Sequence, residues 1–381
     1  MKIKTVAFLA ILPLLFAAFM RPAYAVTFEE NSDAKALILM EASGKKVLYE
    51  RNADTALPPA SVTKIMTILL VLEAIDDGKI ALGDTVTVSD YASGMGGSQV
   101  YLKAGEEMSV SDLLKSVVVS SANDAAVALA EHVLGSEAAF VARMNERAKE
   151  LGMENTVFKN TNGLDDSDEG HLCSARDIAL MTCEVLRHPL IFDYSTIWMD
   201  TIRNGAFGLT NTNRLIRFYQ GANGLKTGST AKAGFCISAT AKRDGMQLVA
   251  VVMGSASRDS RNAVAASMLD FGFSNYEIAS FDGKTEGEIP LLGGTKATVS
   301  GRYEGCEILL EKGKRDDIKA ITEYTPSLAA PVEKGQKIGC IRYVLGEEEL
   351  AACDILAQET VPKISYLHVL TEILRGMLLL S

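Results

Sequence analysis

The sequence lacks the motifs of several common hydrolase and metal-dependent mechanisms. It contains no G-x-S-x-G nucleophile elbow, no H-E-x-x-H helix, and no C-x-x-C or zinc-type spacing. We therefore expect neither a metal ion nor a cofactor. Its four histidines are scattered, so none is assigned a catalytic role and His171 is interpreted as structural; they are His132, His171, His188 and His368.

Clusters of basic residues are also missing. The chain has 38 Lys and Arg against 48 Asp and Glu residues. Removing the first 25 residues takes away Lys2, Lys4 and Arg21, which leaves 35 against 48 and a net charge of −13. An acidic surface without a basic patch argues against a nucleic-acid partner.

Cysteine is sparse, and its spacing does not suggest a disulfide framework. Three cysteines fall in each of the two domains predicted below, so they cannot all pair without a bridge between domains; they are Cys173, Cys183 and Cys236, then Cys306, Cys340 and Cys353. Free and mostly buried thiols are the favoured interpretation.

Residues 1–25 have the pattern of a cleaved export signal. Lys2 and Lys4 give a positive start, residues 6–20 form an apolar run, and Ala-Tyr-Ala at 23–25 fits a small-x-small cleavage site. The run is shorter than the roughly 20 residues that span a bilayer, which disfavours a transmembrane anchor. We expect a mature protein that starts near Val26 and is exported.

The mature chain of about 355 residues is long enough for two domains. Residues 26–275 mix strand and helix patterns, which predicts an α/β (α+β) domain with a sheet and flanking helices. The predicted helices run from Ser61 to Asp76, over 111–134 with a break near Ser121, over 136–151, from Ser174, and over 260–271. The predicted strands are a hairpin over 36–50 and three strands over 224–228, 235–242 and 248–253.

The pattern changes after residue 275. Short β-rich runs such as 296–300, 306–310 and 337–344 alternate with Gly-rich or charged turns, which predicts a small all-β domain over 276–360. No chemistry is evident in it.

Three short motifs occur in a meaningful order. S-x-x-K starts at Ser32, Ser43, Ser61 and Ser229, and S-x-N at Ser121 and Ser260. Only Ser61-x-x-Lys64, then Ser121-x-Asn123, then Lys226-Thr227-Gly228 gives the order S-x-x-K, S-x-N, K-T-G, with gaps of 60 and 105 residues. That ordered set is typical of penicillin-recognising serine enzymes. Ser260-x-Asn262 follows K-T-G and is interpreted as a helix cap.

The first motif fits a nucleophile and its base. At i and i+3 on a helix, Ser61 and Lys64 project from the same face, within reach of each other. The helix N-terminus favours a developing alkoxide on Ser61. Lys64 can act as a base only when neutral, and burial together with the nearby charge of Lys226 would lower its pKa.

The other motifs fit proton relay and substrate binding. The Ser121 hydroxyl suits a relay to the leaving amine, and the Asn123 amide can both donate to and accept from a peptide group. Lys226 and Thr227 offer a charge and a hydroxyl to an anionic substrate, and Gly228 permits close backbone approach. The strand edge there suits binding of an extended peptide, and the backbone N–H groups of Ser61 and Ser229 suit an oxyanion hole.

Around these motifs the chain resembles the low-molecular-mass penicillin-binding proteins of the D-alanyl-D-alanine carboxypeptidase family. The resemblance rests on Pro-Pro-Ala-Ser61-Val-Thr-Lys64, Ser120-Ser121-Ala-Asn123-Asp124, Asn162-Gly163-Leu164, His171-x-x-Ser174-Ala175-Arg176-Asp177, Gly-Leu-Lys226-Thr-Gly-Ser-Thr230 and Ala233-Gly234-Phe235. The second domain and amphipathic tail also match that family's layout.

The resemblance implies an acyl-transfer cycle on peptidoglycan stem peptides that end in D-Ala-D-Ala. Ser61 would attack the penultimate D-alanine carbonyl, and β-lactams would acylate the same serine. One rival is a class A β-lactamase, which needs a glutamate to activate the deacylating water. Glu154 lies in the right stretch, but its surroundings resemble the carboxypeptidase pattern. The other rival is a non-catalytic penicillin-binding sensor, although no signalling segment or lost motif residue is evident.

The C-terminal segment 361–381 predicts an amphipathic helix. Its apolar residues recur at helical spacing opposite a polar stripe; the two sets are Leu367, Leu370, Leu374, Met377 and Leu378, and Ser365, His368, Glu372 and Arg375. Residues 364–380 reach only about 26 Å as a helix, so spanning a bilayer is disfavoured. We expect a helix in the membrane surface that holds the enzyme on the outer face of the cytoplasmic membrane. The alternative is a helix packed on its own β domain.

Overall fold

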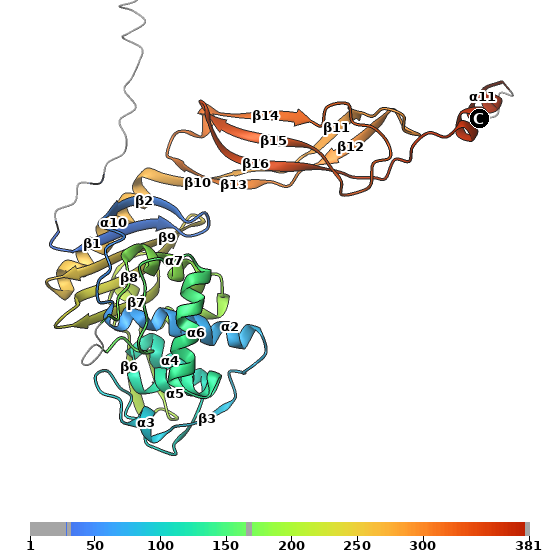
Figure 1. The fold of residues 1–381 in the computed structure, drawn as a ribbon. Coiled ribbons are helices and arrows are strands. Elements are labelled where there is room, and N and C mark those ends of the chain that lie inside the picture. The colour runs from blue at the N-terminus through green and yellow to red at the C-terminus, as the bar shows by residue number, and fades with distance from the viewer. Residues whose placement is uncertain (1–27, 29–31, 165–169, 378–381) are drawn as a thin grey trace, which may run out of the picture. The chain divides into compact units, whose positions relative to one another are not determined.

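The computed structural model describes residue 28 and residues 32–164 and 170–377. The predicted export signal and Leu378 of the tail lie outside these residues. A five-stranded antiparallel sheet forms the centre of the first domain (Figure 1). In spatial order its strands are β2 (Lys46–Arg51), β1 (Ala36–Glu41), β9 (Met246–Ser255), β8 (Gly234–Arg243) and β7 (Ala222–Thr230).

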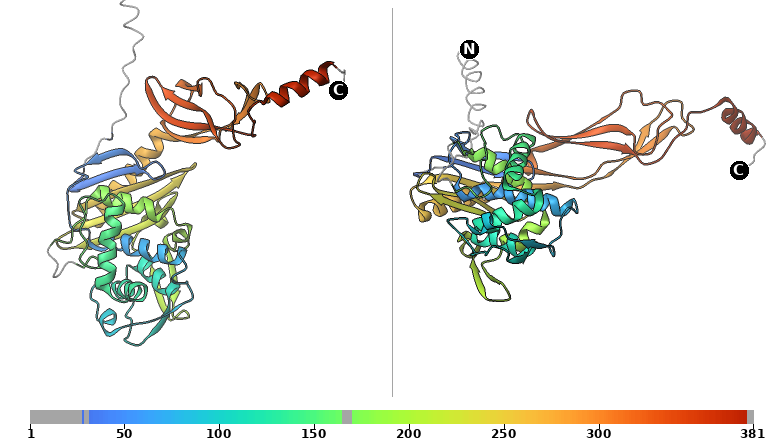
Figure 2. Two further views of the ribbon diagram at one scale, coloured as in Figure 1. Left: turned by 45° about the vertical axis from the view of Figure 1, so that its right-hand side comes forward. Right: turned by 60° about the horizontal axis from the view of Figure 1, so that its bottom comes forward.

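Helices cover both faces of this sheet (Figure 2). On β1, Ile38 and Met40 join the large apolar core that contains α2, whereas Leu39 faces α10. A Cβ on Gly272 of α10 would lie 2.5 Å from a methyl of Leu248, so glycine is what lets this helix approach the strands closely. The longer helices are α2 (Lys64–Asp76), α4 (Val110–Ser120), α5 (Asn123–Leu134), α6 (Glu137–Glu150), α7 (Ala175–Val185) and α10 (Arg258–Asn275).

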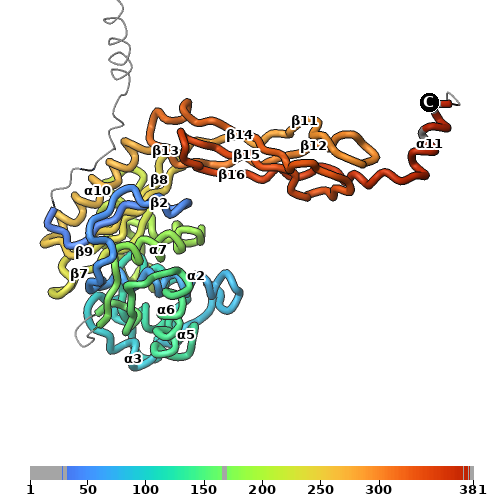
Figure 3. Tube along the Cα trace, turned by 45° about the horizontal axis from the view of Figure 1, so that its top comes forward, coloured from blue at the N-terminus to red at the C-terminus, as the bar shows by residue number. Residues whose placement is uncertain are grey.

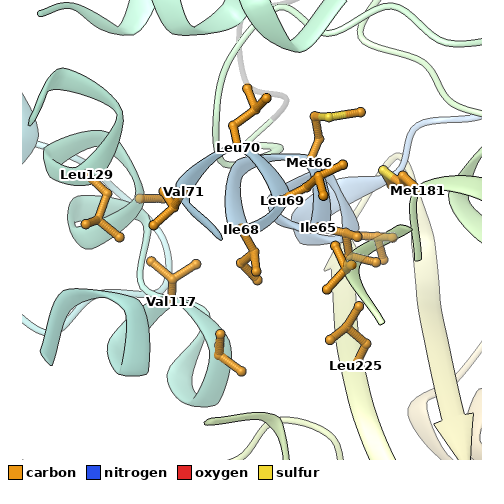
Figure 4. Close-up of a cluster of buried hydrophobic side chains, with 14 of the residues drawn as sticks. Ile65, Met66, Ile68, Leu69, Leu70, Val71, Val117, Leu129, Met181 and Leu225 are labelled. Atoms are coloured by element: carbon orange, nitrogen blue, oxygen red, sulfur yellow. The ribbon is translucent and has the colours of Figure 1, made fainter. Parts of the chain in front are cut away.

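Helix α2 is buried on every side. Figure 4 shows its apolar side chains pointing in several directions, toward Val117, Leu129, Met181 and Leu225 of four other elements. Helical spacing by itself predicts one apolar face here, with Ile65, Leu69, Leu72 and Ile75. That prediction is incomplete because Met66, Ile68, Leu70 and Val71 are buried as well. A helix surrounded by other elements needs no polar face.

Most predicted helix boundaries lie within a few residues of the observed ones, and the cap of α10 is the exception. Ser257 is its N-cap and accepts from the Ser260 backbone N–H, whereas the Ser260 hydroxyl donates to Asp33. The interpretation of Ser260-x-Asn262 as the cap was therefore wrong. By contrast Ser174 caps α7 as expected, accepting from the Asp177 N–H at 3.1 Å.

Short elements complete this domain. They are η1 (Ala60–Thr63), α3 (Asp90–Ser93), η2 (Pro189–Ile191), α8 (Phe192–Ser195) and α9 (Leu215–Phe218), with hairpins β3 (Thr85–Thr87) to β4 (Glu107–Ser109) and β5 (Met199–Ile202) to β6 (Phe207–Thr210). The sequence did not predict the second hairpin, which lies beside the site described below.

The second domain is all-β, as expected, and has its own apolar core. Strands β14, β15 and β16 run side by side in it (Figure 3). One sheet has the order β11 (Thr285–Pro290), β12 (Thr298–Arg302), β16 (Glu348–Ala357), β15 (Lys337–Leu345) and β14 (Ile318–Tyr324); the other pairs β10 (Tyr276–Phe281) with β13 (Cys306–Glu311), and η3 (Arg315–Asp317) precedes β14. This architecture confirms the predicted fold class.

The last element is α11 (Tyr366–Met377), within the predicted tail helix. Its apolar side chains are exposed: Tyr366 by 83%, Leu367 by 71% and Met377 by 77%. Among the described residues no single helix is long and apolar enough to cross a membrane, although the bent pair α5 and α6 meets the length and composition limits together. All six cysteines are free thiols, three buried and three partly buried.

Candidate active site

Ser61 lies in the 3-10 turn η1, directly before α2. The sequence predicted an α-helix starting at Ser61, but the structure places one tight turn between the serine and the helix. In a 3-10 turn the side chains at i and i+3 eclipse each other, which aligns Ser61 with Lys64 more closely than an α-helix would. The Lys64 Nζ lies 2.9 Å from the Ser61 Oγ.

Lys64 is fully buried and donates to the Asn162 carbonyl at 2.7 Å. Burial lowers its pKa well below the ordinary value, and the charge of Lys226 lowers it further, against an opposing effect of Asp124. Desolvation and a like charge both disfavour an ammonium. A neutral amine at this position can accept the Ser61 proton.

A cleft of about 470 Å³ opens beside Ser61, at the free edge of the sheet formed by β7. Among its described lining residues three are arginines and none carries a carboxylate. The lining comprises Ser61, Ser98, Ser121, Trp198, Thr210, Asn211, Thr212, Arg214, Thr227, Gly228, Ser229, Arg258 and Arg261. Glu154 is exposed and is not among them, so the glutamate that a class A β-lactamase needs is not provided by that residue.

Ser121 is held in an unusual backbone conformation at the end of α4. Its φ is 63°, in the left-handed region that non-glycine residues rarely occupy. Its buried hydroxyl has no hydrogen-bond partner among the described residues. A buried hydroxyl without a hydrogen-bond partner lowers the stability of the fold by about 1–3 kcal/mol. A strained backbone and an unpaired hydroxyl at the cleft together fit a residue that contacts a substrate.

Asn123 begins α5 and fixes the loop that carries Ser98 into the cleft. Its backbone N–H donates to the Ser98 carbonyl and its side-chain amide donates to the Gly96 carbonyl, both at 2.7 Å. Its side-chain oxygen is buried without a partner among the described residues. The backbone N–H groups of Val100 and Leu102 in the same loop donate hydrogen bonds to the buried Asp124 carboxylate.

Gly228 is where β7 touches the nucleophile turn. A Cβ there would lie 2.8 Å from the Ser61 nitrogen and 3.0 Å from both the Pro59 carbonyl oxygen and the Val62 nitrogen. All three are backbone atoms, so only glycine lets the strand lie against η1. The neighbour Ser229 is exposed and lines the cleft.

Lys226 is fully buried behind this edge and donates to the Thr227 carbonyl at 3.0 Å. Burial lowers its pKa to about 7, and the charge of Arg261 adds to the effect. The Thr227 hydroxyl donates to the Thr212 hydroxyl at 2.9 Å, and both residues line the cleft. The predicted residues therefore gather in one place, with Lys64, Asn123 and Lys226 buried beside the groups that line the cleft.

Sequence reasoning missed Arg261 of α10. Arg261 is 3% exposed; its guanidinium donates to the Cys236 carbonyl at 3.2 Å and makes no ion pair with a described carboxylate. Burial lowers the pKa of Arg261 to about 10, and the charge of Arg258 contributes to this lowering. A lone arginine outside the motifs gives no signal in one sequence; packing of α10 brings it to the cleft.

His171 supports the nucleophile turn, as a structural histidine would. Its Nδ1 accepts from the Lys159 backbone N–H at 3.2 Å, which leaves Nε2 protonated to donate to the Thr63 hydroxyl at 2.8 Å. Thr63 lies between Ser61 and Lys64 in the chain. His171 thus ties the segment after α6 to η1.

Comparisons with known proteins agree with this geometry. The family model described as D-alanyl-D-alanine carboxypeptidase matches residues 23–257, and the penicillin-binding protein 5 C-terminal domain matches residues 274–363. The D-alanyl-D-alanine carboxypeptidase DacF of Bacillus subtilis is 41% identical over 348 residues, covering 90% of this chain and 89% of that protein. DacC of Escherichia coli is 35% identical over 86% of this chain and 84% of its own length.

Solved structures give the same result. Penicillin-binding protein 5 of Haemophilus influenzae has a TM-score of 0.77 and 31% identity, covering 88% of this chain and 100% of that chain. Penicillin-binding protein D2 of Listeria monocytogenes, in its ampicillin-bound form, has a TM-score of 0.59 and 31% identity, covering 65% of this chain and 100% of that chain. The chain therefore belongs to the D-alanyl-D-alanine carboxypeptidase family and is a serine hydrolase of that family.

Proposed function

We propose that this enzyme removes the terminal D-alanine from peptidoglycan stem pentapeptides through an acyl-enzyme on Ser61. The observation that carries the proposal is the buried Lys64 amine, 2.9 Å from the Ser61 hydroxyl and beside the free edge of β7. A desolvated amine next to a hydroxyl is the arrangement that activates a serine nucleophile.

In the proposed cycle Lys64 takes the Ser61 proton as the Ser61 oxygen attacks the penultimate D-alanine carbonyl. The backbone N–H groups of Ser61 and Ser229 stabilise the oxyanion; the close approach of Gly228 to η1 supports this arrangement. The proton passes through the Ser121 hydroxyl to the leaving amine. Water then hydrolyses the ester and restores Ser61.

Binding is assigned to the groups around this reaction centre. The stem peptide would add as a strand to β7, with the Asn123 amide on its backbone. The terminal carboxylate would meet the Thr227 hydroxyl and the charges of Lys226 and Arg261. Arg261 suits this role because it is buried, fixed by hydrogen bonds to Cys236 and Asn262, and unpaired with any described carboxylate.

We propose that β-lactams acylate the same serine. The ampicillin-bound relative from Listeria monocytogenes shares the fold of this domain. A β-lactam presents a strained amide carbonyl with a nearby carboxylate, which matches the same groups as the peptide.

We also propose the division into an export signal (1–25), an enzymatic domain (26–275), a β domain (276–360) and a membrane-association helix (361–381). The exposed apolar side chains of α11 support attachment to the membrane surface. The enzyme would then work on the cell-wall side of the cytoplasmic membrane.

The test of the activity is mass spectrometry of purified protein with a pentapeptide that ends in D-Ala-D-Ala. We expect release of one D-alanine, and covalent labelling by penicillin at Ser61. Ser61→Ala should abolish both. Lys64→Ala should slow acylation by about 10²- to 10⁴-fold, the range for loss of a general base. Labelling at another serine, or normal acylation of Lys64→Ala, would contradict the assignment.

A further inference from the structure

The cleft is strongly cationic in a protein of net negative charge. Three arginines line it, Arg214, Arg258 and Arg261, and none of its described lining residues is acidic. The whole chain has 48 acidic against 38 basic residues. A cationic, partly enclosed cleft concentrates anionic ligands.

The three arginines lie together on the side of the cleft proposed for the leaving group. The Thr227 hydroxyl, assigned above to the terminal carboxylate, is hydrogen-bonded to Thr212, two residues before Arg214. A guanidinium nitrogen of Arg214 lies 4.0 Å from a carboxylate oxygen of Asp259 in α10. In the sequence Asp259 directly follows Arg258 and comes two residues before Arg261. Ser98 and Ser121, which also line the cleft, are neutral.

This side of the cleft holds more positive charge than a D-alanine leaving group can neutralise. D-alanine has a single carboxylate, and Thr227, Lys226 and the buried Arg261 are already assigned to it. Arg214 and Arg258 are exposed, and Arg258 has no hydrogen bond or ion pair to a described residue. The Asp259 carboxylate near Arg214 is 90% exposed and at the limit of ion-pair distance, so it neutralises Arg214 weakly.

We infer that Arg214 and Arg258 bind a second carboxylate on the leaving group, so that the enzyme also releases C-terminal groups larger and more acidic than D-alanine. The leaving group that supplies this chemistry is a D-amino acid with an acidic side chain. The indole of Trp198, in the same lining, offers an apolar wall to the additional atoms.

The inference rests on the proposed function and changes only the leaving group. The Ser61 oxygen bonds to the carbonyl carbon, the carbon–nitrogen bond to the acidic leaving residue breaks, and its amine takes the Ser61 proton. Water then cleaves the ester. Neither step needs a co-reactant beyond water.

The experiment compares peptides with one acyl half and three ends, D-Ala-D-Ala, D-Ala-D-Glu and D-Ala-D-Gln. D-Glu and D-Gln have the same shape and differ in charge. We expect a kcat/KM about tenfold higher for D-Glu than for D-Gln, the effect of one charge-assisted hydrogen bond. The double variant R214Q/R258Q should bring this ratio close to one.

Arg217→Gln is the matched control. Arg217 is exposed and near the cleft, but it stacks on Trp198 and Phe218 and does not line the cleft. It should keep the D-Glu preference. Penicillin labelling of every variant checks that the site is folded.

Equal rates for D-Glu and D-Gln in the unmodified enzyme, with D-alanine release intact, would overturn the inference and leave the proposed function standing. A D-Glu preference that survives R214Q/R258Q would overturn the assignment to these arginines. Failure of the unmodified enzyme to release D-alanine at all would overturn the proposed function and the inference with it.

Discussion

Two buried lysines divide the electrostatic work of the site. In the proposed cycle Lys64 needs to be neutral to accept a proton, whereas Lys226 would attract the substrate carboxylate only while it is charged. Burial lowers the pKa of both ammonium groups, and a nearby positive charge adds to the effect: Lys226 for Lys64, and Arg261 for Lys226. Their opposite requirements set the pH range of the enzyme.

A falling limb near neutral pH is therefore predicted for kcat/KM with D-Ala-D-Ala peptides. The pKa of Lys226 is lowered to about 7, so raising the pH through this value removes its charge from the free enzyme and weakens carboxylate binding. At lower pH, protonation of Lys64 removes the base, so the profile should be bell-shaped.

Lys226→Arg tests this assignment, since a guanidinium stays charged over the measured range. The falling limb of its pH–rate profile should move upward by more than one pH unit, whatever the loss in absolute rate. An unmoved falling limb would show that another group controls it.

Gly228→Ala is predicted to damage the site through backbone contact alone. The new Cβ would lie 2.8 Å from the Ser61 nitrogen, and a backbone atom cannot move away cheaply. We expect penicillin acylation to slow by at least about tenfold and the unfolding free energy to fall by about 1–3 kcal/mol.

Gly208→Ala is the control, because a Cβ on this strand glycine of β6 would meet no atom within 4 Å. Its acylation rate and thermal stability should stay near those of the unmodified enzyme. Equal behaviour of the two variants would mean that the approach of β7 to η1 does not need glycine.

The motif residues were predictable from sequence because each lies in a recognisable local pattern. Arg261 and the Asn162 carbonyl were not, because their positions depend on packing between distant segments. Asn162 reaches Lys64 across 98 residues of chain, and Arg261 reaches the Cys236 carbonyl from another element. Local spacing carries no information about such contacts.

At the scale of elements, the sequence predicted where a helix begins better than it predicted which elements pack around that helix. Ser174 marked the start of α7 because its hydroxyl satisfies a backbone N–H that the helix leaves open. The burial of α2 on all sides was not predicted, because periodicity describes one helix and not the helices around it. Ser257 and Ser260 both precede or open α10, and only the turn geometry decides which one caps it.

Ser174→Ala should lower the unfolding free energy by about 0.5–2 kcal/mol, the usual loss for an N-cap. The bond to the Asp177 N–H is fully buried, so the loss should fall in the upper half of that range. Ser136→Ala, at the exposed cap of α6, should cost less. Denaturant unfolding measures both, and a larger loss for Ser136→Ala would contradict this explanation.

At the scale of the whole molecule, the candidate active site and the helix proposed for membrane attachment lie in different parts of the chain. The site residues all come from the first domain, and the β domain contributes none of the described residues that line the cleft. Strand and turn patterns predicted that domain as all-β. The order of the strands within each sheet could not be predicted from the sequence, because pairing between strands far apart in the chain is decided by packing.

The tail is where membrane attachment is proposed, and α11 keeps its apolar side chains exposed. Deleting the residues after Pro362 should release the protein from membranes without changing its turnover of small peptides, because none of the described residues of α11 lines the cleft. Leu370→Glu on the apolar face should weaken membrane recovery in the full-length enzyme. His368→Glu adds the same charge on the polar stripe and should weaken it far less.

Sedimentation with vesicles that contain anionic lipid gives the bound fraction of each form. Burial of an apolar helix face holds a protein at the membrane surface in proportion to the area buried, so a charge should matter only on that face. If Leu370→Glu and His368→Glu bound equally, insertion of this face would be wrong. If the truncated and full-length forms were recovered equally, attachment through α11 would be wrong altogether.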